Sequence, residues 1–221
     1  GVNFEDVESG RIQVAAFLVR EYQPFPSNFR STSTLADYLK SQGVLGLEEF
    51  DTRALTRHIR TRGAMRAIAS TKDLDPASLL KRVKKTPRME GQDLAGVVTA
   101  EKPYRWVGGT PRFLDPNAEP LDETVWKHRK EKKSVAAFDF GIKYNILRSL
   151  EAAGCEVIVV PAKTSAETIQ AMSPDGIFLS NGPGDPEPVD YAVKTIRELL
   201  DYRPMFGICL GIQLMGQALG G

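Results

Sequence analysis

Residues 204–219, PMFGICLGIQLMGQAL, decide the fold, because a short apolar strand pattern meets a helix pattern at a single cysteine. Gly207 and Gly211 stand two residues before and two residues after Cys209. A nucleophile on a tight strand-to-helix turn leaves no room for Cβ atoms beside it. The helix dipole and the free N–H groups at a helix N-terminus also favour a thiolate. The spacing therefore predicts a nucleophile turn in which the N–H of Leu210 faces an oxyanion.

Cys209 also has a plainer interpretation, as a small buried residue at a glycine-lined strand end. The turn alone does not decide between the two interpretations. Cys155, the other cysteine, follows Gly154 at the start of an apolar strand without a comparable turn, which indicates a structural role. Two cysteines are too few for a disulfide framework, and no Cys/His spacing indicates zinc, so we expect no metal site.

Upstream of this turn, short apolar runs alternate with amphipathic segments from residue 134 onward. This alternation with short connections predicts an α/β fold, a mostly parallel sheet covered by helices on both faces. Ligands of such sheets bind at the carboxyl ends of the strands, where the cysteine turn and the loop after residue 180 would lie. We predict strands over 134–140, 155–161, 176–180 and 204–208, and helices over 143–154, 166–172, 189–202 and 211–219.

The second candidate site segment is the loop SNGPGDPEP, residues 180–188, which interleaves Asn181, Gly182 and Gly184 with prolines. Such a loop is stiff and lets bare backbone amides approach a ligand closely. It is shorter than a phosphate-binding P-loop and lacks the Lys-Ser/Thr pair of that motif. The pattern favours an oxyanion or substrate-clamping role over an ordinary strand-to-helix turn.

The first part of the chain is less regular, and it predicts a separate α/β domain over residues 1–98. Asp51 begins one helix as its N-cap, and Gly43 and Gly63 end two of them. Residues 99–133 contain several prolines, a VGG triplet and the charged run KHRKEKK, which fits a linker over the surface. The second domain would then be 134–221. In the first domain we predict a buried strand over 11–22 and helices over 31–43, 51–63 and 75–85.

Charge and hydropathy exclude several classes of function. The chain has 29 Lys and Arg against 28 Asp and Glu, so no global field favours nucleic acid or an anionic membrane. No apolar run is long enough to span a bilayer, and we expect no signal peptide. We expect a protein of the reducing cytoplasm.

The two candidate site segments resemble a known family. FLSNGPGDPEPVDYAVKTIRELL (178–200) and PMFGICLGIQLMGQALGG (204–221) resemble class I, triad-type glutamine amidotransferases. Residues 27–67, from SNFR through DTRALTR to GAMRA, resemble the N-terminal domain of the carbamoyl-phosphate synthetase small-subunit family, and residues 136–162 fit the same family. The resemblance covers essentially the whole chain. It implies a flavodoxin-like glutaminase domain behind a small-subunit N-terminal domain.

The resemblance also implies a chemistry. Cys209 would attack the carboxamide carbon of glutamine, release ammonia and form a glutamyl thioester that water hydrolyses. The backbone amides of Gly182 and Leu210 would form the oxyanion hole. Gln213 lies four residues after the cysteine, about one helical turn on. The glutamine-binding residues implied by the family are Gly182, Gly184, Leu210 and Gln213.

The implied partner is a large synthetase subunit. It would use this ammonia, ATP and Mg to make carbamoyl phosphate for pyrimidine and arginine biosynthesis, as a ligase. The chain itself would need no cofactor, and glutamine would be its small-molecule substrate.

The chain departs from the family in ways that limit what we expect it to do alone. The family activates its cysteine with a histidine and a glutamate well downstream of the turn, at positions beyond Gly221. His58, on a first-domain helix, and His128, in the charged linker, are not expected to replace them. The family's opening strands are also absent, and Ile212 stands where many members carry histidine. We expect a fragment clipped at both ends, with little activity alone, an exposed apolar sheet edge and poor solubility.

Three other functions stay open. One is a non-catalytic docking subunit, which the missing histidine and glutamate favour for these residues alone. Another is the glutaminase of a different class I amidotransferase, such as anthranilate synthase, which shares the turn but not the first domain. The third is a related cysteine hydrolase, against which the loop at 180–188 and the first domain both argue.

Overall fold

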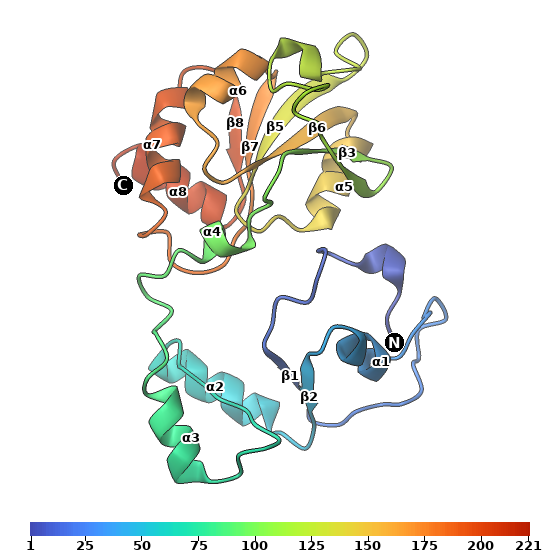
Figure 1. Ribbon diagram of the computed structural model, residues 1–221, viewed down its shortest axis with the longest axis vertical. Helices are drawn as coiled ribbons and strands as arrows, with labels where there is room; N and C mark the ends of the chain where they lie inside the picture. Colours follow the sequence, from blue (N-terminus) through green and yellow to red (C-terminus); the bar gives the residue numbers. More distant parts are fainter. The chain divides into compact units, whose positions relative to one another are not determined.

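The computed structural model describes residues 1–221, which divide into two compact units, Gly1–Met89 and Glu90–Gly221 (Figure 1). The second unit is a six-stranded sheet with helices on both faces, and it carries both candidate site segments. The first unit holds a two-stranded sheet and three helices. None of the helices in the chain combines the length and apolar character needed to cross a bilayer.

The sheet of the second unit has the strand order β4-β3-β6-β5-β7-β8. β6, β5, β7 and β8 run parallel, as predicted, while β3 pairs antiparallel with both β6 and β4. The strands are β3 Tyr104–Val107, β4 Thr110–Phe113, β5 Lys133–Asp139, β6 Cys155–Pro161, β7 Gly176–Leu179 and β8 Met205–Gly207. The helices are α4 Leu94–Val98, α5 Tyr144–Ala152, α6 Ala166–Met172, α7 Asp190–Leu199 and α8 Leu210–Ala218, with a 3-10 turn η2 at Glu123–Val125.

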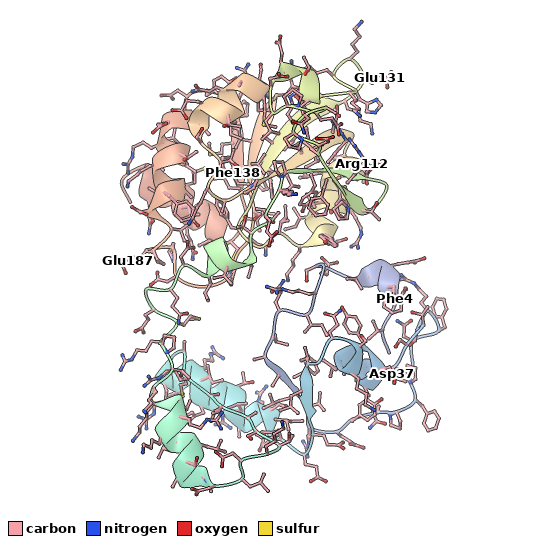
Figure 2. The ribbon with its side chains drawn as sticks, in the orientation of Figure 1. Phe4, Asp37, Arg112, Glu131, Phe138 and Glu187 are labelled. Carbon is pink, nitrogen blue, oxygen red and sulfur yellow. The ribbon has the colours of Figure 1, made fainter.

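Side-chain alternation along the strands builds two cores, one on each face of this sheet. Phe138 of β5 and Leu179 of β7 pack on the face covered by α6, α7 and α8. Ala137 and Phe178, their neighbours in sequence, pack on the face covered by α5. Phe138 is 1% exposed and lies in the interior of the unit (Figure 2). Burying a side chain of this size contributes about 1.5–3 kcal/mol, so the central strands are the most strongly held part of the unit.

The predicted linker over residues 99–133 was wrong, and so was the predicted domain boundary at residue 98. This segment adds the β3–β4 hairpin to the sheet and buries Trp106 and Trp126, which are 3% and 6% exposed. Gly108 and Gly109 make the two-residue turn with φ of 57° and 81°, which a hairpin of this type requires. The prolines and charges around the triplet VGG favoured the linker prediction. The hairpin explains instead why two glycines are needed there.

The first unit confirms the predicted helices but not the long buried strand. Asp51 caps α2 by accepting a hydrogen bond from the N–H of Ala54 at 2.8 Å. Of residues 11–22 only three form a strand, and Phe17 within it is 40% exposed. The elements are η1 Phe4–Asp6, β1 Ala16–Leu18, α1 Leu35–Ser41, β2 Leu45–Leu47, α2 Thr52–Arg62 and α3 Pro76–Val83, and β1 pairs parallel with β2.

An apolar edge is exposed, as predicted, at β8. This strand pairs only with β7, and Phe206 in it is 63% exposed. An unpaired strand edge of this kind is a site for association with another chain. The low solubility that we expect from it stays a prediction.

Candidate active site

Cys209 lies on a strained turn between β8 and α8. Its φ of 54° and ψ of −113° fall in a region that residues with a side chain rarely adopt. The side chain is exposed, and α8 begins at the next residue. The turn thus presents a thiol to solvent at the N-terminus of a nine-residue helix, where the helix dipole favours negative charge.

The two flanking glycines are required by close backbone contacts. A Cβ on Gly207 would lie 2.7 Å from the carbonyl carbon of Gly211 and from the amide nitrogen of Ile212. A Cβ on Gly211 would lie 2.3 Å from the carbonyl oxygen of Leu179. Real Cβ atoms essentially never approach so closely, so a side chain at either position would force the turn open. The turn therefore has the geometry that the spacing of its glycines predicts.

Gly182 and Leu210, the predicted oxyanion-hole residues, lie beside one another. A Cβ on Gly182 would lie 2.6 Å from Cδ2 of Leu210 and 2.4 Å from the carbonyl oxygen of Phe140. Neither the N–H of Gly182 nor that of Leu210 donates a hydrogen bond within the chain. Leu210 directly follows the exposed Cys209 and Gly182 packs on Leu210, so these two unpaired backbone donors are candidates to bind the oxygen of a tetrahedral intermediate.

Ser180 is a positioning residue that the sequence analysis did not single out. It is fully buried, and its hydroxyl accepts from the N–H of Phe140 at 2.9 Å and donates to the carbonyl of Asn181 at 2.8 Å. Its own carbonyl accepts from the N–H of Gly211 at 3.0 Å. One residue thereby joins the end of β5, the glycine loop and the first turn of α8. A serine directly after an apolar strand was the available signal.

Asn181 and Asp139 hold the neighbouring loop after β5. The Asn181 amide donates to the carbonyl of Gly141 at 2.9 Å and accepts from the N–H of Lys143 at 3.2 Å. Asp139, 5% exposed, accepts from the N–H groups of Gly141 and Ile142 at 2.8 Å each. These bonds satisfy backbone groups at the carboxyl edge of the sheet and tie the loop after β5 to the loop after β7.

Gly184 and Gln213, the other predicted glutamine-binding residues, lie on the same two segments. Gly184 has a φ of 85°, which favours glycine, in the loop that also carries Glu187 (Figure 2). The N–H of Gln213 donates to the carbonyl of Cys209 at 3.2 Å, which places Gln213 one turn along α8. Its side chain is exposed and makes no hydrogen bond within the chain. The substrate-binding roles of both residues stay predictions.

No side chain of the chain makes a hydrogen bond with Sγ of Cys209. The main-chain N–H of His128 donates at 2.8 Å to Glu156, the second residue of β6. His128 therefore lies at the amino end of the strands, opposite the cysteine turn, in agreement with the sequence-based expectation. His58 is an exposed residue of α2 in the first unit. No group of three or more His, Cys, Asp or Glu side chains is placed to hold a metal ion.

Cys155 differs from Cys209 in every structural respect. It is the first residue of β6, part of a regular strand pairing with β5, and it is partly buried. Burial raises the pKa of its thiol, which favours the protonated form. The structure thus separates an exposed cysteine on a strained turn from a cysteine that belongs to the sheet.

Comparison with known proteins identifies both units. Residues 136–221 match the family Glutamine amidotransferase class-I, and residues 1–69 match Carbamoyl-phosphate synthase small chain, CPSase domain. The sheet with its flanking helices agrees with the flavodoxin-like fold expected of a class I amidotransferase.

Curated relatives match over the whole chain. The carbamoyl phosphate synthase small chain of Syntrophotalea carbinolica is 52% identical over 221 residues, and that of Thermosynechococcus vestitus is 50% identical over the same length. The small chain of Maridesulfovibrio salexigens is 48% identical. The match covers all of this chain and 57%, 56% and 58% of the three relatives, so the chain spans little more than half of their length. The chain belongs to the carbamoyl phosphate synthase small-chain family, with a class I glutamine amidotransferase domain in its second unit.

Proposed function

We propose that this chain supplies the glutaminase activity of a carbamoyl phosphate synthase. The observation that carries the proposal is the arrangement around Cys209: an exposed thiol on a strained turn, followed directly by Leu210, on which Gly182 packs, both with unpaired N–H groups. Family membership adds the substrate class, because class I amidotransferases take their nitrogen from the carboxamide of glutamine.

The chemistry follows from these groups. Sγ of Cys209 forms a bond to the carboxamide carbon of glutamine, and the carbonyl oxygen takes the negative charge between the two N–H donors. The C–N bond then breaks, the proton given up by the thiol goes to the leaving nitrogen, and ammonia departs from a glutamyl thioester. Water attacks the thioester, which releases glutamate and restores the thiol. Gly184 and Gln213 would hold the amino-acid part of glutamine.

The partner in this proposal is a large synthetase chain. It would receive the ammonia and use bicarbonate and ATP with Mg, so that the small chain needs no cofactor of its own. The near balance of charge over the chain agrees with a protein partner rather than nucleic acid. A cytoplasmic location, and low activity of these 221 residues by themselves, stay predictions.

A trapped intermediate tests the proposal. The polypeptide expressed from the complete reading frame is incubated with radiolabelled glutamine, quenched in acid and digested, so that a thioester remains on its peptide. We expect label on the Cys209 peptide, released by hydroxylamine, together with ammonia production. Cys209→Ser should abolish both, and Cys155→Ser, the matched control, should retain both.

A docking subunit without catalysis is the second candidate, and one observation favours it. No acid or base within the chain contacts Sγ of Cys209, and a nucleophile normally needs one. The same experiment separates the two functions. If the unsubstituted protein neither acquires label nor releases ammonia, yet still binds its large partner, the glutaminase proposal fails and the docking function stands.

A further inference from the structure

The segment Asp93–Ala100 crosses the carboxyl edge of the sheet, next to the glycine loop. The hydroxyl of Thr99 accepts from the N–H of Ala162, just after β6, at 2.9 Å. The N–H of Ala100 donates to the carboxylate of Asp139, at the end of β5, at 2.8 Å. The chain is thus fixed across two strand ends immediately after α4, and α4 itself lies at this edge (Figure 1). The sequence pattern had placed these residues at a domain border.

α4 packs directly on the loop that carries the predicted oxyanion and glutamine contacts. A Cβ on Gly184 would meet the Leu94 side chain at 3.3 Å. A Cβ on Gly141 would meet Cγ2 of Val98 at 3.0 Å and Cδ of Pro183 at 3.1 Å. Leu94 and Val98, at the two ends of α4, therefore contact the loop and its neighbour. α4 thus packs against the loop at Gly184, while the N–H of Gly182 has no hydrogen bond of its own.

Asp93 ties the start of α4 to the far end of the glycine loop. Its Oδ1 accepts from the N–H of Gly96 at 2.7 Å, which caps α4, and from the hydroxyl of Tyr191 at 3.1 Å. Tyr191 is the second residue of α7, the helix that the loop enters. Burial, and then the nearby Asp93, raise the pKa of Tyr191, so its hydroxyl remains a donor throughout the physiological range. The ammonium of Lys163 lies 5.2 Å from the centre of the Tyr191 ring.

We propose that Asp93, through its hydrogen bond to Tyr191, is a positioning residue that holds the Gly182–Gly184 segment against the cysteine turn. This inference rests on the proposed glutaminase function. Asp93 touches neither substrate nor nucleophile; it fixes α4 and the first turn of α7, and these hold the loop between them. An oxyanion donor must lie within a fraction of an ångström of its working position, so a loosened loop lowers the rate of the chemical step.

A helix cap alone would have a different signature. If Asp93 served only the N–H of Gly96, its loss would lower stability and leave the rate constants of the folded enzyme unchanged. Tyr191→Phe separates the roles, because it removes the hydroxyl and leaves the cap and the ring in place. Asp93→Asn should behave like the unsubstituted protein, since an amide oxygen can accept from both donors.

The test is steady-state glutamine hydrolysis by the polypeptide from the complete reading frame. We expect Asp93→Ala and Tyr191→Phe each to lower kcat/KM for glutamine roughly three- to tenfold, which corresponds to the net contribution of one ordinary hydrogen bond. The loss should lie in kcat, because an oxyanion donor acts on the transition state. Asp93→Asn should keep kcat within about twofold of the value for the unsubstituted protein.

Tyr202→Phe is the matched control. The Tyr202 hydroxyl donates to the backbone carbonyl of Gln170 at 3.2 Å, a hydrogen bond from the same donor group in the same unit, between α6 and the segment after α7. Tyr202→Phe should leave kcat unchanged. The inference is overturned if Tyr191→Phe retains the unsubstituted kcat, or if Tyr202→Phe loses as much. Failure of the proposed function looks different, because the unsubstituted protein would then release no ammonia, and that result removes both proposals.

Discussion

At the scale of single residues, the cysteine turn depends on two glycines, because no residue with a side chain fits at their positions. Gly207 and Gly211 allow β8 and α8 to meet at Cys209 with carbonyl and amide atoms closer than any Cβ permits. The sequence predicted this part of the site well, because close backbone contact leaves a visible pattern of glycines. Ser180 and Asp93 leave a weaker signal, since their roles depend on partners about 30 to 100 positions away along the chain.

Gly211→Ala tests the close contact directly. Its Cβ would lie 2.3 Å from the carbonyl oxygen of Leu179, so we expect the free energy of unfolding to fall by about 1–3 kcal/mol, as for overpacked sites. Gly216→Ala is the control in the same helix, because a Cβ there meets nothing within 4 Å, and it should stabilise by about 0.5–1 kcal/mol. Urea unfolding measures both. Equal stability of the two variants would contradict the packing described for the turn.

At the scale of secondary-structure elements, the sequence predicted those helices and strands whose own residues carry a clear hydrophobic pattern. The strands and helices after residue 133 were predicted because apolar runs alternate there with amphipathic segments over short connections. The β3–β4 hairpin was missed, since its four-residue strands are too short for alternation to stand out. What joins it to the sheet is tertiary: Arg105 of β3 forms a buried ion pair with Glu156 of β6. The segment after the hairpin is held by Trp126, whose Nε1 donates to the carbonyl of Met172 at 2.6 Å.

An ion cluster at this hairpin predicts a pH dependence of stability. Hydrogen bonds from Arg112, and then from Lys127, lower the pKa of Glu119 to about 2 from an ordinary value of 4.5. A depressed folded-state pKa contributes stability that is fully present above the unfolded-state pKa and is lost as the pH falls through the folded-state value. We expect Glu119→Gln to lower the melting temperature at pH 7, and the difference from the unsubstituted protein to shrink between about pH 4.5 and pH 2.

Thermal melting from pH 7 down to pH 2 checks the cluster at Glu119. Glu151→Gln cannot serve as the control, because Glu151 itself supports the hairpin by accepting a hydrogen bond from the N–H of Gly108 in the turn. Asp190→Asn is better suited: the ion pair of Asp190 with Lys194 lies on the surface of α7, with both side chains about 70% exposed, and should contribute little. If the difference in melting temperature between Glu119→Gln and the unsubstituted protein stays constant with pH, the carboxylate charge does not stabilise the hairpin.

At the scale of the whole molecule, the two units differ in how much of their surface they bury. The second unit buries both faces of its sheet, whereas α2 and α3 of the first unit contain no buried residue. Residues with few buried contacts open at low free energy, while core strands open only with the unit as a whole. We expect amide hydrogen exchange to be slowest in β5 and β6 and fastest in α2 and α3, measured by mass spectrometry. Protection of α2 equal to that of β6 would contradict this difference.

The central claim is that Cys209 is a glutamine-directed nucleophile, and covalent labelling tests it most directly. The polypeptide from the complete reading frame is treated with a diazoketone analogue of glutamine, with and without glutamine, and its peptides are analysed by mass spectrometry. The account predicts that the Cys209 peptide is modified, that glutamine protects it, and that the Cys155 peptide stays unmodified. Absence of modification at Cys209, or modification that glutamine does not slow, would contradict the account and leave an inert cysteine on a strained turn.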